Sequence, residues 1–143
     1  MQEPESEPTL NPKSELVKNW LIKAKRDLNT AKRLSKEPEP YLDTAIYHCQ
    51  QAVEKAVKGF LVFNDIRFEK THDIEVLIQL AIPVNEEFSN WLDAGETLTP
   101  YATAYRYPGE NVEPSKEEFD EALKTASDIF SFILNILPVE VHP

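Results

Sequence analysis

The chain has 143 residues, with one cysteine, three glycines, eleven prolines and a net charge of −10 at neutral pH. That length is enough for one domain to bury about two thirds of its unfolded surface, and the single Cys49 excludes an intramolecular disulfide. The acidic, proline-containing N-terminus is unlike a secretory signal, and the most apolar run, residues 129–139, is too short to span a bilayer, so we expect a cytoplasmic protein with no membrane role.

Charge is unevenly distributed along the chain. Residues 13–36 contain eight Lys or Arg and two acids, whereas residues 83–121 contain ten acids and two bases. If RNA binds, four lysines at helical spacing would form a stripe that faces phosphate: Lys18, Lys25, Lys32 and Lys36. Ordinary solvation of helix surfaces explains the same pattern, and the overall acidity argues against broad nonspecific binding of nucleic acid.

The first predicted helix follows a disordered acidic tail over residues 1–12. Ser14 is a plausible N-cap, and apolar residues then recur at spacings of three and four up to about Ser35 or Lys36. Asp27 lies beside this apolar stripe, where a carboxylate is costly to bury without a partner. We therefore expect Asp27 to pair with Arg106 or Lys55.

A second helix is predicted from Tyr41 or Leu42 to about Phe63, after a proline-rich break at residues 37–40. Its inward positions are mostly small, and Gly59 marks a close crossing with a neighbouring helix. A set of polar or amphipathic side chains lies on the opposite face, which we expect to meet solvent or a partner: Tyr47, Gln51, Glu54 and Lys58.

Two further helices complete the pattern. We expect the third to begin at Thr71 or His72, with Thr71 as its cap, and a short helix to run through residues 99–105. Ser115 and Glu118 form a capping-box signature for a last helix that ends near Leu137. The prediction is an all-α, antiparallel up-and-down bundle of four main helices plus a short extra helix over residues 13–138, with a flexible tail at residues 139–143.

Several kinds of chemistry have no support in the sequence. There is no glycine-rich phosphate loop, and His48, His72 and His142 lack the paired spacing of a metal site, so we expect neither metal nor cofactor. Cys49 falls on the apolar side of its helix, as a small core residue does. The aromatic group Tyr101, Tyr105 and Tyr107 could stack bases, but such clusters usually serve packing.

Four motifs in order resemble the HEPN family of small helical bundles. They are Trp20-Leu21 with Ala24 and Asp27-Leu28, Gln51-Ala-Val-Glu-Lys55 with Lys58, Thr71-His72-Asp73, and Arg106-Tyr107-Pro108. The resemblance implies a bundle that commonly dimerises and that is associated with nucleotides or RNA, often encoded beside a small nucleotidyltransferase. Many members are metal-independent ribonucleases or toxins.

The nucleases of that family use an Arg, four to six residues, then a His, near the start of the last long helix. In this chain Arg67 and His72 have that spacing but precede the third helix, and no His follows Arg106 at the required distance. We therefore predict a noncatalytic module. The alternatives are a metal-independent endoribonuclease that uses Arg67 and His72, and a pure interaction bundle whose polar residues only hold the fold together.

The nucleotide-binding branch of the family implies a polar cleft lined by Asp27, Gln51, Lys55, His72 and Arg106. Lys55 and Arg106 would meet phosphate, while Gln51 and Asp27 orient them or the base. The partners to expect are a nucleotide or RNA, a nucleotidyltransferase and a second copy of the chain, and the setting to expect is a toxin–antitoxin or defence system.

Overall fold

The computed structural model describes residues 10–109 and 112–143, so most of the predicted N-terminal tail lies outside the described residues. Within these ranges the secondary structure is entirely helical, which confirms the all-α prediction. The elements are α1 (Pro12–Leu34), α2 (Leu42–Phe63), α3 (Ile74–Ala81), α4 (Leu92–Leu98) and α5 (Lys116–Asn135), with 3-10 turns η1 (Glu86–Trp91), η2 (Thr99–Ala102) and η3 (Val139–Val141).

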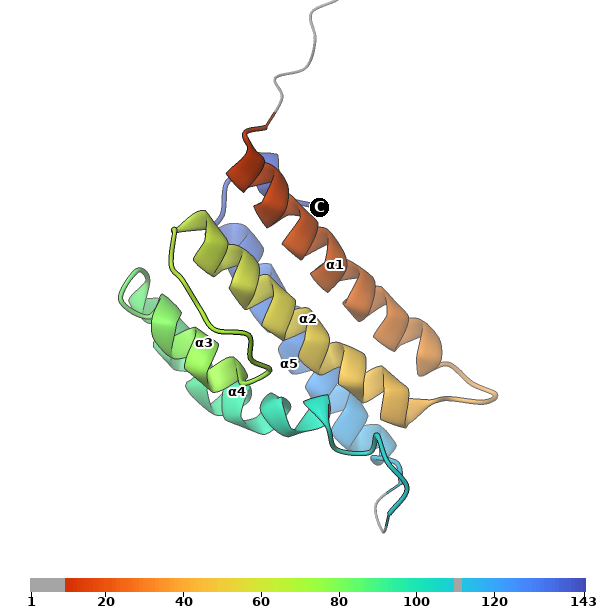
Figure 1. Ribbon diagram of the computed structural model, residues 1–143. Helices are drawn as coiled ribbons and strands as arrows, with labels where there is room; N and C mark the ends of the chain where they lie inside the picture. Colours follow the sequence, from red (N-terminus) through yellow and green to blue (C-terminus); the bar gives the residue numbers. More distant parts are fainter. Residues whose placement is uncertain (1–9, 110–111) are drawn as a thin grey trace, which may run out of the picture.

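The long helices α1, α2 and α5 pack side by side, and the short pair α3 and α4 covers the remaining side of α2 and α5 (Figure 1). Successive helices alternate in direction except once, because α2 and α3 run parallel. The linker of residues 64–73 makes this possible, since it returns along the C-terminal half of α2, as far as Gln50, before α3 begins.

The linker is held to α2 at both of its ends. At one end the backbone N–H of Ile66 donates to the Leu61 carbonyl at 2.9 Å. At the other end the Gln50 amide donates to the His72 carbonyl at 2.9 Å. These two bonds attach an otherwise irregular segment to the central helix, and they place its side chains over α2.

Three predicted helix starts or caps are wrong. Asn11, not Ser14, caps α1, because its side chain accepts from the Ser14 N–H at 2.8 Å. Asp73, not Thr71, caps α3 by accepting from the Val76 N–H at 3.2 Å, since the preceding residues belong to the linker. The short fourth helix comes earlier than predicted, and only a 3-10 turn follows at residues 99–102.

The C-terminal region differs from the prediction in a similar way. Ser115 caps α5 as expected, by accepting from the Glu118 N–H at 3.1 Å. The sequence predicts a flexible tail from residue 139, whereas the structure gives these residues a 3-10 turn with a buried Val141. The His142 ring lies 3.0 Å from the Leu137 carbonyl and closes that turn.

The core surrounds α2, which is covered by α1, by α5, and by α3 with its linker. This corrects the prediction that Gln51, Glu54 and Lys58 lie on an outer face, since their exposed fractions are 7%, 4% and 6%. The spacing of apolar residues identified one buried side of α2 but could not show that its polar side is covered as well. Beyond α2, Phe88 packs between Phe60 and Phe132, with ring centroids 4.7 and 5.0 Å away.

The predicted close crossing at Gly59 is present. A Cβ at Gly59 would lie 3.2 Å from Trp20 Cβ and 3.5 Å from Leu21 Cδ2, both on α1. The absence of a side chain therefore sets how closely α1 approaches α2.

We expect Gly59→Val to lower the free energy of unfolding by about 1–3 kcal/mol, because the added branches force α1 away from α2. Urea denaturation measures this change. Gly109→Val is the control, since a Cβ at Gly109 would meet nothing within 4 Å. Equal stability of the two variants would contradict the role given to Gly59.

Candidate functional site

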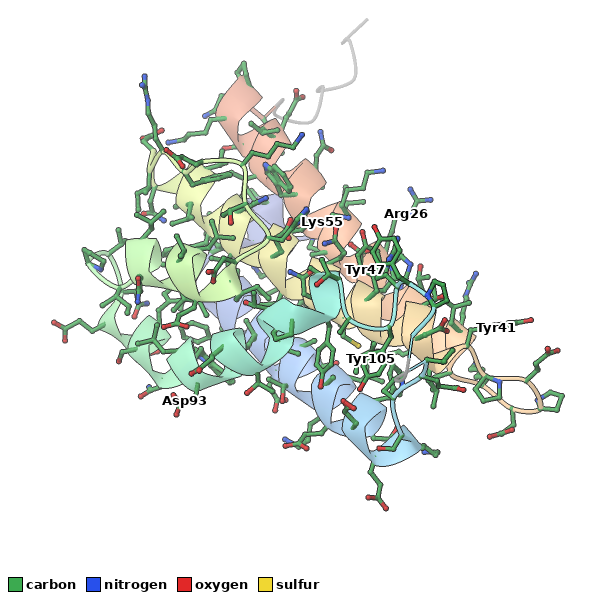
Figure 2. All side chains as sticks on the ribbon, turned by 60° about the horizontal axis from the view of Figure 1, so that its bottom comes forward. Arg26, Tyr41, Tyr47, Lys55, Asp93 and Tyr105 are labelled. Atoms are coloured by element: carbon green, nitrogen blue, oxygen red, sulfur yellow. The ribbon has the colours of Figure 1, made fainter. Side chains whose placement is uncertain are left out.

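One side of α2 carries most of the polar residues of the molecule's interior. We call it the polar face of α2 and define it as Tyr47, His48, Gln51, Glu54, Lys55 and Lys58, whose spacings of three, four and seven keep them on one side of a helix. In Figure 2, Tyr47 and Lys55 stand on this helix, with Arg26 on the neighbouring α1. The face contacts α1 along one edge and the linker along the other.

Asp27 of α1 forms the first cluster of this face. Its Oδ2 lies 2.7 Å from Lys55 Nζ and its Oδ1 lies 2.8 Å from His48 Nδ1. A carboxylate only accepts hydrogen bonds, so His48 Nδ1 carries a proton in this arrangement. The expected pairing of Asp27 with Lys55 is present, and His48 is a second partner. We call these three residues the Asp27 cluster.

Glu54 forms a second cluster on the same face. Its Oε1 lies 2.7 Å from His72 Nδ1 and its Oε2 accepts from Lys58 Nζ at 3.1 Å. The amides of Gln50 and Gln51 also donate to Oε1, at 3.3 and 3.4 Å. We call Glu54, Lys58, His72 and the two glutamines the Glu54 cluster. Four donors around one carboxylate offset the cost of burying it.

The ammonium group of Lys58 also lies between two aromatic rings. Its Nζ is 5.8 Å from the centroid of Trp20 on α1 and 5.7 Å from that of Phe68 in the linker. These cation–π contacts and Glu54 together replace the water that burial removes from the charge. Lys58 therefore has a structural explanation that needs no ligand.

Arg106 reaches the same face from the loop that follows η2. Its guanidinium carbon lies 3.8 Å above the centre of the Tyr47 ring. The Tyr47 and His48 rings meet edge to face, with centroids 5.3 Å apart. A continuous row of contacts therefore joins Arg106 to the Asp27 cluster.

The five residues of the predicted cleft thus fall into three groups on one helix face. Asp27 and Lys55 pair directly, Gln51 and His72 both contact Glu54, and Arg106 stacks on Tyr47. The predicted cleft left out two members of these groups, His48 and Glu54, although Glu54 was predicted to lie on the same face as Gln51. Their signal was present, because both lie at helical spacing from Gln51 and Lys55, but a covered face and a solvated face have the same spacing.

Arg67 and His72, the alternative nuclease pair, have different surroundings. His72 has a side chain that is 64% exposed, with Nδ1 held by buried Glu54. Arg67 is exposed and lies at the rim of a hollow of about 430 Å³ over α3, whose lining does not include His72. Within residues 10–109 and 112–143, no hydrogen bond joins the two side chains.

No helix in the described part of the chain is long and apolar enough to cross a membrane. No group of three or more His, Cys, Asp or Glu side chains among those same residues is placed to hold a metal ion. The predicted lysine stripe on α1 is largely exposed, and Arg26 and Arg33 flank an open hollow of about 300 Å³ beside it.

We expect Cys49 to be unreactive toward a thiol reagent in the native protein. Burial raises the pKa of the Cys49 thiol to about 12, so almost no thiolate exists at neutral pH. Titration with a chromogenic disulfide should detect no thiol until denaturant is added, and then one. Rapid labelling of the folded protein would contradict the core position.

We expect Glu54→Gln to lower the free energy of unfolding by about 3–5 kcal/mol, because it leaves the buried Lys58 charge without its carboxylate. Asp120→Asn is the matched control, since Lys116 and Asp120 form an exposed pair at the same spacing. That change should cost no more than about 0.5 kcal/mol. Chemical denaturation of both variants measures the difference, and similar losses would contradict the burial of the Glu54 cluster.

Comparison with known proteins agrees with this fold and its motifs. A family model of the HEPN domain matches residues 17–137. A candidate toxin of Methanocaldococcus jannaschii, MJ1304, is 33% identical over 136 residues, a match that covers 85% of this chain and 88% of that protein.

Two solved structures are similar as well. The crystal structure of ST0689, an archaeal HEPN homologue, superposes with a TM-score of 0.65 at 27% identity, over 83% of this chain and 95% of that one. The crystal structure of TT1696 from Thermus thermophilus superposes with a TM-score of 0.70 at 22% identity, over 86% of this chain and 99% of that one. At this identity the likeness shows the fold alone. With the family match over most of its length, this chain belongs to the HEPN domain family.

Proposed function

We propose that this chain is a noncatalytic HEPN module that binds the phosphate of a nucleotide or RNA beside the Asp27 cluster. The observation that supports it is the row of contacts from Arg106 through Tyr47 and His48 to Asp27 and Lys55. This row holds an ammonium group, a guanidinium group and an imidazole, and its only carboxylate is that of Asp27. The site therefore has an excess of hydrogen-bond donors for an anion.

The exposure of these side chains favours a ligand from solvent. Asp27 is buried, whereas the side chains of Lys55 and His48 are 25% and 24% exposed and Arg106 is exposed. An ammonium group has three donors, and Asp27 takes one of those on Lys55. A guanidinium stacked on an aromatic ring still presents its N–H groups at the edge, where they suit a phosphate.

The candidate toxin of Methanocaldococcus jannaschii supports a wider role for the module. We propose a toxin-like role for the chain on this basis. From the family resemblance we further propose that it acts as a dimer and that its protein partner is a nucleotidyltransferase. In that setting the phosphate site would engage either RNA or the nucleotide of the partner enzyme.

We expect Lys55→Gln and Arg106→Gln each to weaken binding of a fluorescent single-stranded RNA or of ATP by about tenfold or more, since each loses a charge-assisted hydrogen bond worth about 1.5–3 kcal/mol. Fluorescence polarisation for the RNA and calorimetry for ATP measure the affinities at low salt. Lys124→Gln is the control, because Lys124 is exposed on α5 and pairs with Asp128.

If both variants keep their fold and bind the RNA and ATP with unchanged affinity, the proposed phosphate site is wrong. If Asp27→Ala and Arg106→Ala instead lower stability and no ligand is bound, the polar residues only hold the bundle together.

A second function has one observation in its favour. Glu54 holds Nδ1 of the exposed His72, which is how a carboxylate orients a catalytic histidine. The corresponding enzyme is a metal-independent endoribonuclease that uses Arg67 and His72.

Our proposal expects no cleavage when the protein is incubated with mixed single-stranded RNA in excess EDTA. Gel analysis of the RNA checks this. Cleavage that disappears in both Arg67→Ala and His72→Ala, with their stability unchanged, would replace the binding module with the nuclease.

A further inference from the structure

The residue before Arg106 has an unusual backbone conformation. Tyr105 has φ of 65°, in the left-handed region that favours glycine, and it is one of two non-glycine residues with positive φ in the described chain. The other is Asp65, a residue type that adopts this region more readily than an aromatic one does. A bulky residue keeps such a conformation only when its surroundings determine it.

The hydroxyl group of Tyr105 is bound by Glu118 in the first turn of α5. It lies 2.9 Å from both carboxylate oxygens of Glu118. Tyr101 donates to the same carboxylate at 3.2 Å, and the two tyrosine rings stack with centroids 6.3 Å apart and planes 19° from parallel. We call Tyr101, Tyr105 and Glu118 the tyrosine clasp.

The position of Glu118, which binds both tyrosine hydroxyl groups, is fixed by the start of α5. Its backbone N–H donates to Ser115 at the start of α5, so the capping interaction holds the turn that carries it. Its side chain does not complete the capping box and instead reaches the two tyrosines. Burial and the neighbouring carboxylate raise the pKa of both phenols, so they remain donors at neutral pH.

The clasp determines where the next residue lies. The Arg106 N–H donates to the Thr103 carbonyl at 3.2 Å, and the Thr103 N–H donates to the Pro100 carbonyl at 3.1 Å, so residues 100–106 form consecutive turns. Tyr105 is held at its hydroxyl by Glu118, the N–H of the next residue is bonded to Thr103, and the side chain of Arg106 extends from there toward α2. There its guanidinium lies on Tyr47, although Arg106 itself is exposed.

We propose that Glu118 is a positioning residue, which acts through Tyr105 to hold Arg106 on Tyr47 and so present its guanidinium to the phosphate. The presentation of the guanidinium to phosphate rests on the proposed function, whereas the positioning of Arg106 on Tyr47 does not. It extends the site to α5, a helix that contributes no residue to the phosphate contact.

NMR of the ligand-free protein tests the positioning. The side-chain protons of Arg106 should be shifted upfield by the Tyr47 ring current, since the guanidinium lies 3.8 Å above the ring. Tyr105→Phe and Glu118→Ala should move these signals toward ordinary arginine values. Glu118→Gln keeps an acceptor and should move them less. Glu121→Gln is the control, because it removes a neighbouring carboxylate of α5 outside the clasp.

Unchanged Arg106 signals in Glu118→Ala, with the melting temperature retained, would overturn the proposal. So would the absence of an upfield shift in the wild type.

Affinity for the fluorescent RNA or ATP tests the presentation of the guanidinium to phosphate. Glu118→Ala should weaken binding by about the same factor as Arg106→Gln, and the double variant should lose no more than either single one. If the losses of affinity in the two single variants add fully in the double variant, Glu118 does not act through Arg106. If the wild-type protein binds neither probe, the proposed function fails, while the NMR result still decides whether Glu118 positions Arg106.

Discussion

The structure depends on one constraint: α2 carries charged side chains and is nevertheless covered over most of its surface. Glu54 meets this constraint with donors from its own helix and from the linker, namely Lys58, the two glutamine amides and His72. Because His72 supplies both its ring and its carbonyl to α2, the linker must return along that helix. The parallel run of α2 and α3, and hence the position of α4 against α5, follows from this return. A buried charge network thus sets the one departure from simple alternation of the described helices.

At the other edge of α2, a buried carboxylate is paired with side chains that remain partly exposed. Asp27 is buried, but its partners Lys55 and His48 keep part of their surface exposed. Within the Glu54 cluster the pair of Glu54 and Lys58 is therefore closed, with the ammonium group between Trp20 and Phe68, whereas both partners of Asp27 keep donors near solvent. This contrast is why the proposed ligand site lies at the seam of α1 and α2, and not beneath the linker. Tyr47 connects the open cluster to Arg106 and so brings a loop near α5 into the site.

Local patterns in the sequence predicted the long helices, the Ser115 cap, the close crossing at Gly59 and the need of Asp27 for a positive partner. Each of these depends on spacing within one helix or on a single residue type. The burial of Glu54 and Lys58 could not be predicted in the same way, because helical spacing shows which residues share a side but not what covers that side. The return of the linker and the binding of two tyrosines by Glu118 join residues 13 to 22 positions apart, so no local signal indicates them. Asn11 was overlooked because Ser14, three residues later, is an equally good capping type.

The attachment of the linker also affects its motion. A segment of ten residues without regular structure would ordinarily open at little cost, and its amide hydrogens would exchange with solvent quickly. Here opening would remove His72 from Glu54 and Phe68 from Lys58, and it would expose a buried ion pair that has lost part of its compensation. The linker therefore belongs to the same cooperative unit as α2, and its hydrogen-bonded Ile66 amide should open only with the core. We therefore expect this irregular segment to unfold together with α2 and not before it.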